Sequence, residues 1–137
     1  MNDKTATRIA PMLAVSDAPA AIEFYKNAFE AEELWRIEGE GVAGLAIDGA
    51  EFFLAEESPE FGTRGPDGIG ATTVRIELFV DDPRAVQARA IAAGAREHSP
   101  VNEHAHTTFG PQPIRRMMQG AVLDPFGHLW LIGKFLD

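Results

Sequence analysis

One sequence pattern occurs twice along this chain and limits what it can fold into. The segment VSDAPAA around Asp17 returns as VDDPRAV around Asp82, and each copy follows a stretch rich in alternating apolar residues. In both copies an Asp stands where a helix N-cap is favoured, and a Pro follows in the first helical turn. We interpret the two copies as an internal duplication, in which one structural plan is used twice.

The first copy predicts a strand, a helix and then three strands. The helix is AAIEFYKNAF, in which Ile22, Tyr25 and Phe29 recur at helical spacing. Turn signals such as Asp48-Gly49 divide the strand-like stretches that follow it. The expected strands of this copy are residues 8–15, 32–38, 42–48 and 51–56.

The second copy repeats this order but is less regular in its middle. AVQARAIAAG predicts the helix, with Gly94 as its C-terminal stop. The turn Asp-Pro-Phe-Gly at 124–127 separates the last two strands. Pro100 and other prolines predict that strand pairing breaks soon after the helix, where only a short strand remains. A long irregular loop over 97–113 is then expected, which could act as a lid. The expected strands are residues 72–80, 96–101, 115–123 and 128–135.

The order of elements predicts an α+β fold of two βαβββ modules in one domain. Module one covers about residues 8–60, the Gly-rich segment FGTRGPDGIGA at 61–71 is a linker, and module two covers about 72–137. Each module alone has a half-covered sheet, so the two modules must pack together.

Composition excludes several functions. The net charge of −9 argues against nucleic acid and against an anionic membrane surface as partners, because both need clustered Lys and Arg. The chain has no cysteine, which excludes disulfides, thiolate metal sites and a cysteine nucleophile. An apolar signal region and a membrane-length apolar run are both absent from the sequence, so we expect a cytoplasmic protein.

Three segments in this order and spacing carry a family resemblance: VSDAPAAIEFYKNAF, VDDPRAVQARAIAAGA and the closing DPFGHLWLIGK. Together they resemble the vicinal oxygen chelate superfamily of glyoxalases, bleomycin-resistance proteins and dioxygenases, and most closely its PhnB-like branch. The resemblance covers nearly the whole chain. It implies that the modules form a curved mixed sheet around a cleft with the helices outside, that a small molecule binds in the concave interior, and that the protein is a homodimer.

The resemblance also implies four strand positions that hold a divalent metal ion in metal-dependent members. They fall on Ala10, Arg75 and Leu131, with the fourth near Phe53 or Leu54. Alanine and leucine have no lone pairs to offer, and a guanidinium repels a cation. We therefore predict no metal and no cofactor at this site.

Alternation along residues 73–80 predicts which side chains face the cleft. Arg75, Glu77 and Phe79 share one face of this strand, and the apolar residues between them share the face under the helix. The Arg and Glu either line a ligand pocket or form a salt bridge on a solvated or dimeric surface. Glu77 is the candidate for acid–base catalysis. The remaining candidates for the cleft wall, each of which could instead fill the core or an interface, are Met12, Trp35, Phe109, Met118 and Leu131.

Taken with these features, the resemblance implies a metal-independent protein that binds a small molecule and sequesters an antibiotic-like ligand. The acidic charge of the chain favours a cationic compound. The alternative is a lyase, isomerase or dioxygenase with a displaced metal site built from Glu51 or Glu56 and a loop histidine, for which His98, His104 and His106 are available. A third possibility is a housekeeping dimer whose cleft has become interface.

Overall fold

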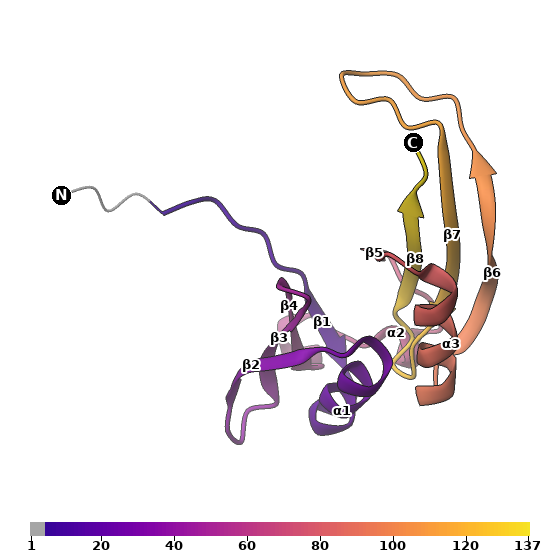
Figure 1. The fold of residues 1–137 in the computed structure, drawn as a ribbon. Coiled ribbons are helices and arrows are strands. Elements are labelled where there is room, and N and C mark those ends of the chain that lie inside the picture. Colours follow the sequence, from indigo (N-terminus) through magenta and orange to yellow (C-terminus); the bar gives the residue numbers. More distant parts are fainter. Residues whose placement is uncertain (1–4) are drawn as a thin grey trace.

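A computed structural model describes residues 5–137, and its elements follow the same order twice (Figure 1). Module one consists of β1 (Met12–Val15), α1 (Ala18–Phe29), β2 (Glu32–Ile37), β3 (Val42–Ile47) and β4 (Ala50–Glu56). Module two consists of β5 (Arg75–Phe79), α3 (Pro83–Ala93), β6 (Arg96–Ala105), β7 (Arg116–Leu123) and β8 (Leu129–Phe135). Two short helical turns lie between the modules, η1 (Pro59–Phe61) and α2 (Pro66–Ile69).

Each module forms its own four-stranded mixed sheet. The strand order is β1-β4-β3-β2 in module one and β5-β8-β7-β6 in module two. The first strand of each module runs parallel to the last, and the other neighbours are antiparallel. The α+β class and the two repeated modules predicted from the sequence are therefore confirmed.

Both repeated Asp residues cap a helix as the sequence predicts. The Asp17 carboxylate accepts a hydrogen bond from the Ala20 backbone N–H at 3.0 Å, and the Asp82 carboxylate accepts from Ala85 at 3.2 Å. These bonds satisfy N–H groups that have no partner inside the helix. The two caps place the two helices at equivalent points of the two modules.

Each helix covers one face of its own sheet, and the other face of each sheet is left open. The helices therefore lie on the outside of the molecule. Helices α1 and α3 also contact each other, so the two modules share one hydrophobic core. Figure 1 shows the modules diverging from the region where the helices meet. The opposite face of each sheet carries large exposed apolar side chains.

A buried carboxylate in the turn between β7 and β8 also joins the modules. Asp124 accepts hydrogen bonds from the Tyr25 hydroxyl of α1 at 2.5 Å and from Trp130 Nε1 at 2.9 Å. Its other oxygen accepts from the backbone N–H groups of Phe126 and His128. His128 Nε2 lies 2.7 Å from the carbonyl oxygen of Ala14 at the end of β1. The Asp-Pro-Phe-Gly turn therefore holds module one as well as closing a hairpin.

The structure differs from the sequence-based expectation at several places. Strand β1 begins at Met12 instead of residue 8, and β5 begins at Arg75 instead of residue 72. The linker contains the helical turn α2, and the turn η1 lies where module one meets the linker. Strand β6 continues past Pro100 to Ala105, which shortens the expected loop. An edge strand tolerates proline because the missing N–H faces away from the ladder, and the pairing of β6 with β7 shifts register on both sides of Ser99. Within residues 5–137, no helix is long and apolar enough to cross a membrane.

Candidate functional site

The open face of module one carries a row of four residues that we name the aromatic shelf. Strand pairing aligns Trp35 with Gly44, Gly44 with Phe53, and Phe53 with Met12. Residues directly paired across a sheet point to the same side, so these four share the open face. The rings of Trp35 and Phe53 are 5.2 Å apart in an edge-to-face arrangement. The shelf is therefore a continuous apolar surface across the whole sheet.

Gly44 allows Trp35 to lie against the sheet. A Cβ atom added at Gly44 would lie 2.4 Å from Trp35 Cε2 and Nε1, closer than atoms approach without a shift. The indole consequently rests on bare backbone, with its other face turned outward. Trp35 remains 38% exposed and Met12 53% exposed. An exposed apolar surface of this kind is typical of a binding surface.

One ion pair lies on the open face of module one, next to the shelf. Arg8 Nη2 lies 2.5 Å from Glu51 Oε1. Glu51 is aligned with Ala46 and precedes Phe53 by two residues, so it shares the face of the shelf. The pair places charged groups beside the apolar surface.

The open face of module two carries the predicted polar and aromatic groups. Arg75, Glu77 and Phe79 are exposed, while Ile76 and Leu78 are partly buried against the core. The alternation along β5 therefore follows the pattern expected for this strand.

Glu77 has a partner that the sequence did not indicate. Gln119 Nε2 on β7 donates a hydrogen bond to Glu77 Oε1 at 3.1 Å. In the described part of the chain, no salt bridge joins Arg75 to Glu77. Leu131 on β8 is aligned with Glu77, and the ring of Phe79 lies 4.8 Å from that of Phe135. We name this set of side chains the Glu77 face: Glu77, Phe79, Gln119, Leu131 and Phe135.

The remaining sequence candidates lie elsewhere. Met118 lies on the helix side of its sheet, where its Sδ is 3.4 Å from Arg84 Nη1 of α3, because the alternation of β7 gives the open face to Gln119. Phe109 lies in the loop between β6 and β7 and is 90% exposed. His104 Nε2 lies 3.3 Å from the Gln119 carbonyl oxygen.

The strand positions that the resemblance assigns to a metal carry unsuitable side chains. Phe53 belongs to the aromatic shelf and Leu131 to the Glu77 face, and neither has a donor atom. Ala10 precedes β1, and Arg75 carries a positive charge. Among residues 5–137, no group of three or more His, Asp or Glu side chains is arranged to hold a metal ion. The side chains present do not fit the metal of the superfamily.

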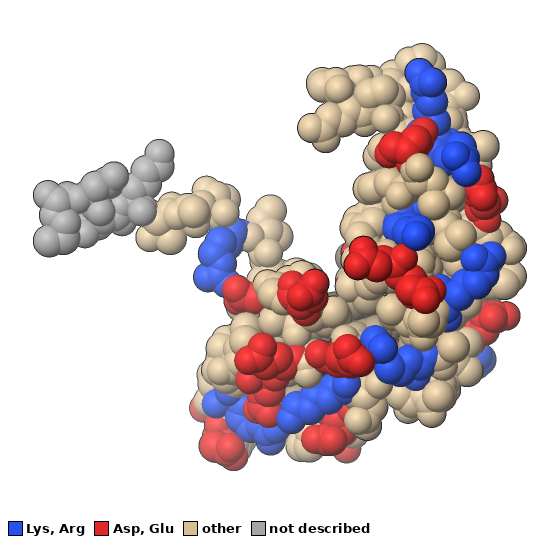
Figure 2. Space-filling model, in the orientation of Figure 1, with Lys and Arg blue, Asp and Glu red and all other residues tan. Residues whose placement is uncertain are grey.

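The structure thus brings the candidates together in two groups, one on each module. Met12 and Trp35 belong to the aromatic shelf, and Arg75, Glu77, Phe79 and Leu131 share the open face of module two. Over the described residues, no hydrogen bond or ion pair links the two groups. Figure 2 shows a hollow between the two modules, with acidic and basic side chains interspersed around it.

Comparisons with known proteins agree with this fold. A model of the Glyoxalase/Bleomycin resistance protein/Dioxygenase superfamily matches residues 7–132. An uncharacterised protein of Mycobacterium tuberculosis is 35% identical over 133 residues, which is 92% of this chain and 73% of that protein.

Solved structures resemble the chain over nearly its whole length. The crystal structure of TioX from Micromonospora sp. ML1 has a TM-score of 0.67 at 24% identity, covering 96% of this chain and 100% of that one. A glyoxalase/bleomycin resistance protein/dioxygenase family enzyme from Burkholderia phytofirmans has a TM-score of 0.66 at 19% identity, covering 91% of this chain and 95% of that one. At these identities the likeness is one of fold.

Proposed function

Because the chain belongs to the glyoxalase/bleomycin resistance/dioxygenase superfamily, we propose that it binds a small organic molecule on its open sheet faces without a divalent metal. Membership of the PhnB-like branch of that superfamily stays a prediction, and so does a cytoplasmic location. The binding function rests on one observation above all. The aromatic shelf presents a large indole, a phenyl ring and a thioether to the outside of a folded sheet.

The residues of the shelf suit a ligand with a flat apolar part. Trp35 and Phe53 offer ring faces and edges, and Met12 offers a flexible, polarisable side chain that adapts to irregular shapes. Burial of such surface by a ligand contributes about 25 cal/mol per Å². Stacking on the exposed side of Trp35 would therefore supply the main part of the affinity.

Charge favours a cationic group on the same ligand. The chain has a net charge of −9, which attracts cations over the whole surface. The Glu77 carboxylate is exposed, its hydrogen-bond partner Gln119 is neutral, and within the described chain it forms no ion pair within 4.0 Å. We propose sequestration of a cationic, antibiotic-like compound, with the cleft completed in a homodimer.

The test is a ligand panel that includes cationic glycopeptides of the bleomycin kind, with two readouts. A ligand present at about 100 times its Kd stabilises the native state by about 2.7 kcal/mol, so the thermal unfolding midpoint rises. Binding at the shelf also changes the fluorescence of Trp35, whereas the second tryptophan, Trp130, is 1% exposed and reports little. Absence of any stabilisation across the panel would contradict the proposal.

Matched variants localise the binding. Trp35→Ala removes the stacking surface, and we expect affinity for any binder to fall about tenfold. Phe61→Ala removes a ring that is 86% exposed on η1, which belongs to neither sheet, and should leave affinity unchanged. Equal affinity in the two variants would place binding away from the shelf.

The alternative, a metal-dependent lyase, isomerase or dioxygenase, would need a displaced site built from Glu51 or Glu56 and a histidine. Glu51 forms the ion pair with Arg8, and Glu56 Oε2 accepts from the Ala18 backbone N–H at the start of α1. The candidate histidines of this displaced metal site lie on β6 and the loop after it, in module two, whereas both glutamates lie in module one. Elemental analysis of untagged protein tests this directly, since a stoichiometric transition metal would favour the enzyme.

A further inference from the structure

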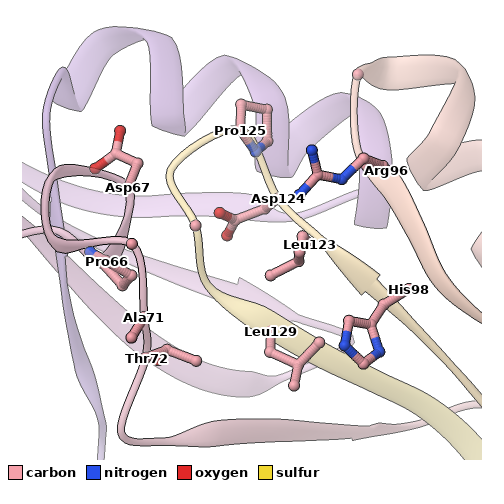
Figure 3. Close-up of a pocket in the computed structure, with 13 residues that line it drawn as sticks. Pro66, Asp67, Ala71, Thr72, Arg96, His98, Leu123, Asp124, Pro125 and Leu129 are labelled. Carbon is pink, nitrogen blue, oxygen red and sulfur yellow. The ribbon is translucent and has the colours of Figure 1, made fainter.

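A cavity of about 580 Å³ lies between the linker and the edge of the module-two sheet where β6 and β8 begin and β7 ends. We name it the linker trough. Figure 3 shows Asp67 and Ala71 of the linker, and Thr72 just after it, along one side, and Arg96 and His98 of β6 along the other. Cavities of this size commonly hold small organic ligands. The trough is lined by residues that neither the aromatic shelf nor the Glu77 face contains.

The floor of the trough is apolar. Leu123 on β7 and Leu129 on β8 are paired across the sheet, and Figure 3 shows both between the two walls. Both side chains are partly exposed although they lie at the ends of buried strands. The floor therefore offers hydrocarbon surface to whatever enters the cavity.

Strand pairing places basic residues at both ends of this floor. Leu123 is aligned with Arg96 on β6, and Leu129 is aligned with Arg75 on β5. The row across the sheet thus reads Arg75, Leu129, Leu123, Arg96. Arg and leucine side chains aligned in this way share one face. His98 follows Arg96 by two residues and adds an imidazole to the same wall.

These basic groups have no acidic partner within the described chain. Arg75 and Arg96 form no ion pair within 4.0 Å, whereas Arg8, Arg36 and Arg116 do. Two carboxylates also line the trough. The Asp124 oxygens already accept from Tyr25, from Trp130 and from two backbone N–H groups, and Asp67 lies on the opposite, linker wall. Arg96 is left available to bind an anion.

We propose that the linker trough binds an organic carboxylate with an apolar body. The carboxylate is held by the guanidinium of Arg96, which binds such groups through two parallel hydrogen bonds, with His98 beside it. The apolar body lies over Leu123 and Leu129. This site goes beyond the proposed function: it takes an anion, while the shelf and the Glu77 face favour a cation.

The test uses naphthylacetate, its neutral amide naphthylacetamide and inorganic phosphate as probes of the full chain. Backbone amide signals of isotope-labelled protein are followed by NMR during each titration. Naphthylacetate should shift the amides of Gly94, Leu123 and Leu129 and bind about tenfold more tightly than the amide, because a charge-assisted bidentate pair is lost in the amide. Phosphate should bind more weakly than naphthylacetate, because it covers none of the floor.

Two variants assign the charge. Arg96→Gln should weaken naphthylacetate binding about tenfold while leaving its amide unaffected. Arg115→Gln changes an exposed arginine on the loop before β7 and should alter the affinity less than about twofold. Equal binding of acid and amide, unchanged affinity in Arg96→Gln, or phosphate binding as tight as naphthylacetate would overturn the proposal. Naphthylacetate-induced shifts confined to the amide signals of Trp35 and Phe53 would also overturn the proposal. Failure of the aromatic shelf to bind any ligand would contradict the proposed function and not the linker trough.

Discussion

At the scale of single residues, Asp124 and Tyr25 form the most consequential buried contact. Tyr25 is fully buried, and its hydroxyl donates to the Asp124 carboxylate. Burial, and next the negative charge of Asp124, raise the pKa of Tyr25 well above its ordinary value of 10.0. Because Tyr25 is the only tyrosine of the chain, its ionisation can be observed without interference.

This raised pKa predicts a loss of stability in alkali. Above pH 10.0 the unfolded chain loses the Tyr25 proton while the folded chain keeps it, so the unfolded state is favoured. The free energy of unfolding should be unaffected by Tyr25 below pH 10.0 and should fall above it by up to about 1.4 kcal/mol per pH unit. Denaturant unfolding at several pH values, with tyrosinate absorbance followed in parallel, measures both effects.

Tyr25→Phe is the matched control. It should have a flatter pH dependence than the wild type over the same alkaline range, since its ring does not ionise. Tyrosinate absorbance that appears near pH 10.0 in the folded protein would contradict the raised pKa.

At the scale of elements, local chemistry in the sequence predicts the helices and the facing of β5. The caps Asp17 and Asp82 act through neighbouring N–H groups, and the alternation of Arg75, Glu77 and Phe79 follows from strand geometry. Such signals need no knowledge of distant residues.

Features that depend on strand pairing were not predictable in this way. Gln119 contacts Glu77 only because β7 and β5 both flank β8. Met118 lies on the helix side of the sheet because a shift of one residue along a strand moves a side chain to the opposite face. Gly44 beneath Trp35 likewise depends on the pairing of β2 with β3. The module-joining role of Asp124 rests on a contact with α1, which lies far away in the sequence.

The end of α1 carries a backbone conformation that its residue does not favour. Glu30 has φ of 56° in the left-handed region, where glycine is preferred at a helix C-terminus. Glu30→Gly should therefore raise the free energy of unfolding by about 1 kcal/mol. The gain is reduced slightly because the substitution also removes the exposed ion pair between Glu30 and Arg89. Denaturant unfolding checks this value. Glu40→Gly, at a turn residue outside the positive-φ set, should bring no gain, and a gain of equal size there would show that φ is not the cause.

At the scale of the whole molecule, the open sheet faces and the edge strands beside them predict self-association. Met12 and Phe79 are exposed on the open faces, and β1 and β5 each pair on one side only. A sheet edge with unpaired backbone groups beside exposed apolar residues favours pairing with another chain. We therefore expect a homodimer, in which the partner covers part of both faces and encloses the ligand cleft.

Charge placed on these faces should separate the dimer. Met12→Glu together with Phe79→Glu buries unpaired carboxylates in the expected interface, so sedimentation should show a single-chain mass where the wild type shows twice that mass. Phe61→Glu places a single carboxylate on η1, outside both sheets, and should remain dimeric. If the doubly charged protein stays dimeric, the contact lies elsewhere and the open faces are left to the ligand alone. If it becomes monomeric, the two copies contact each other through the open faces that carry the aromatic shelf and the Glu77 face.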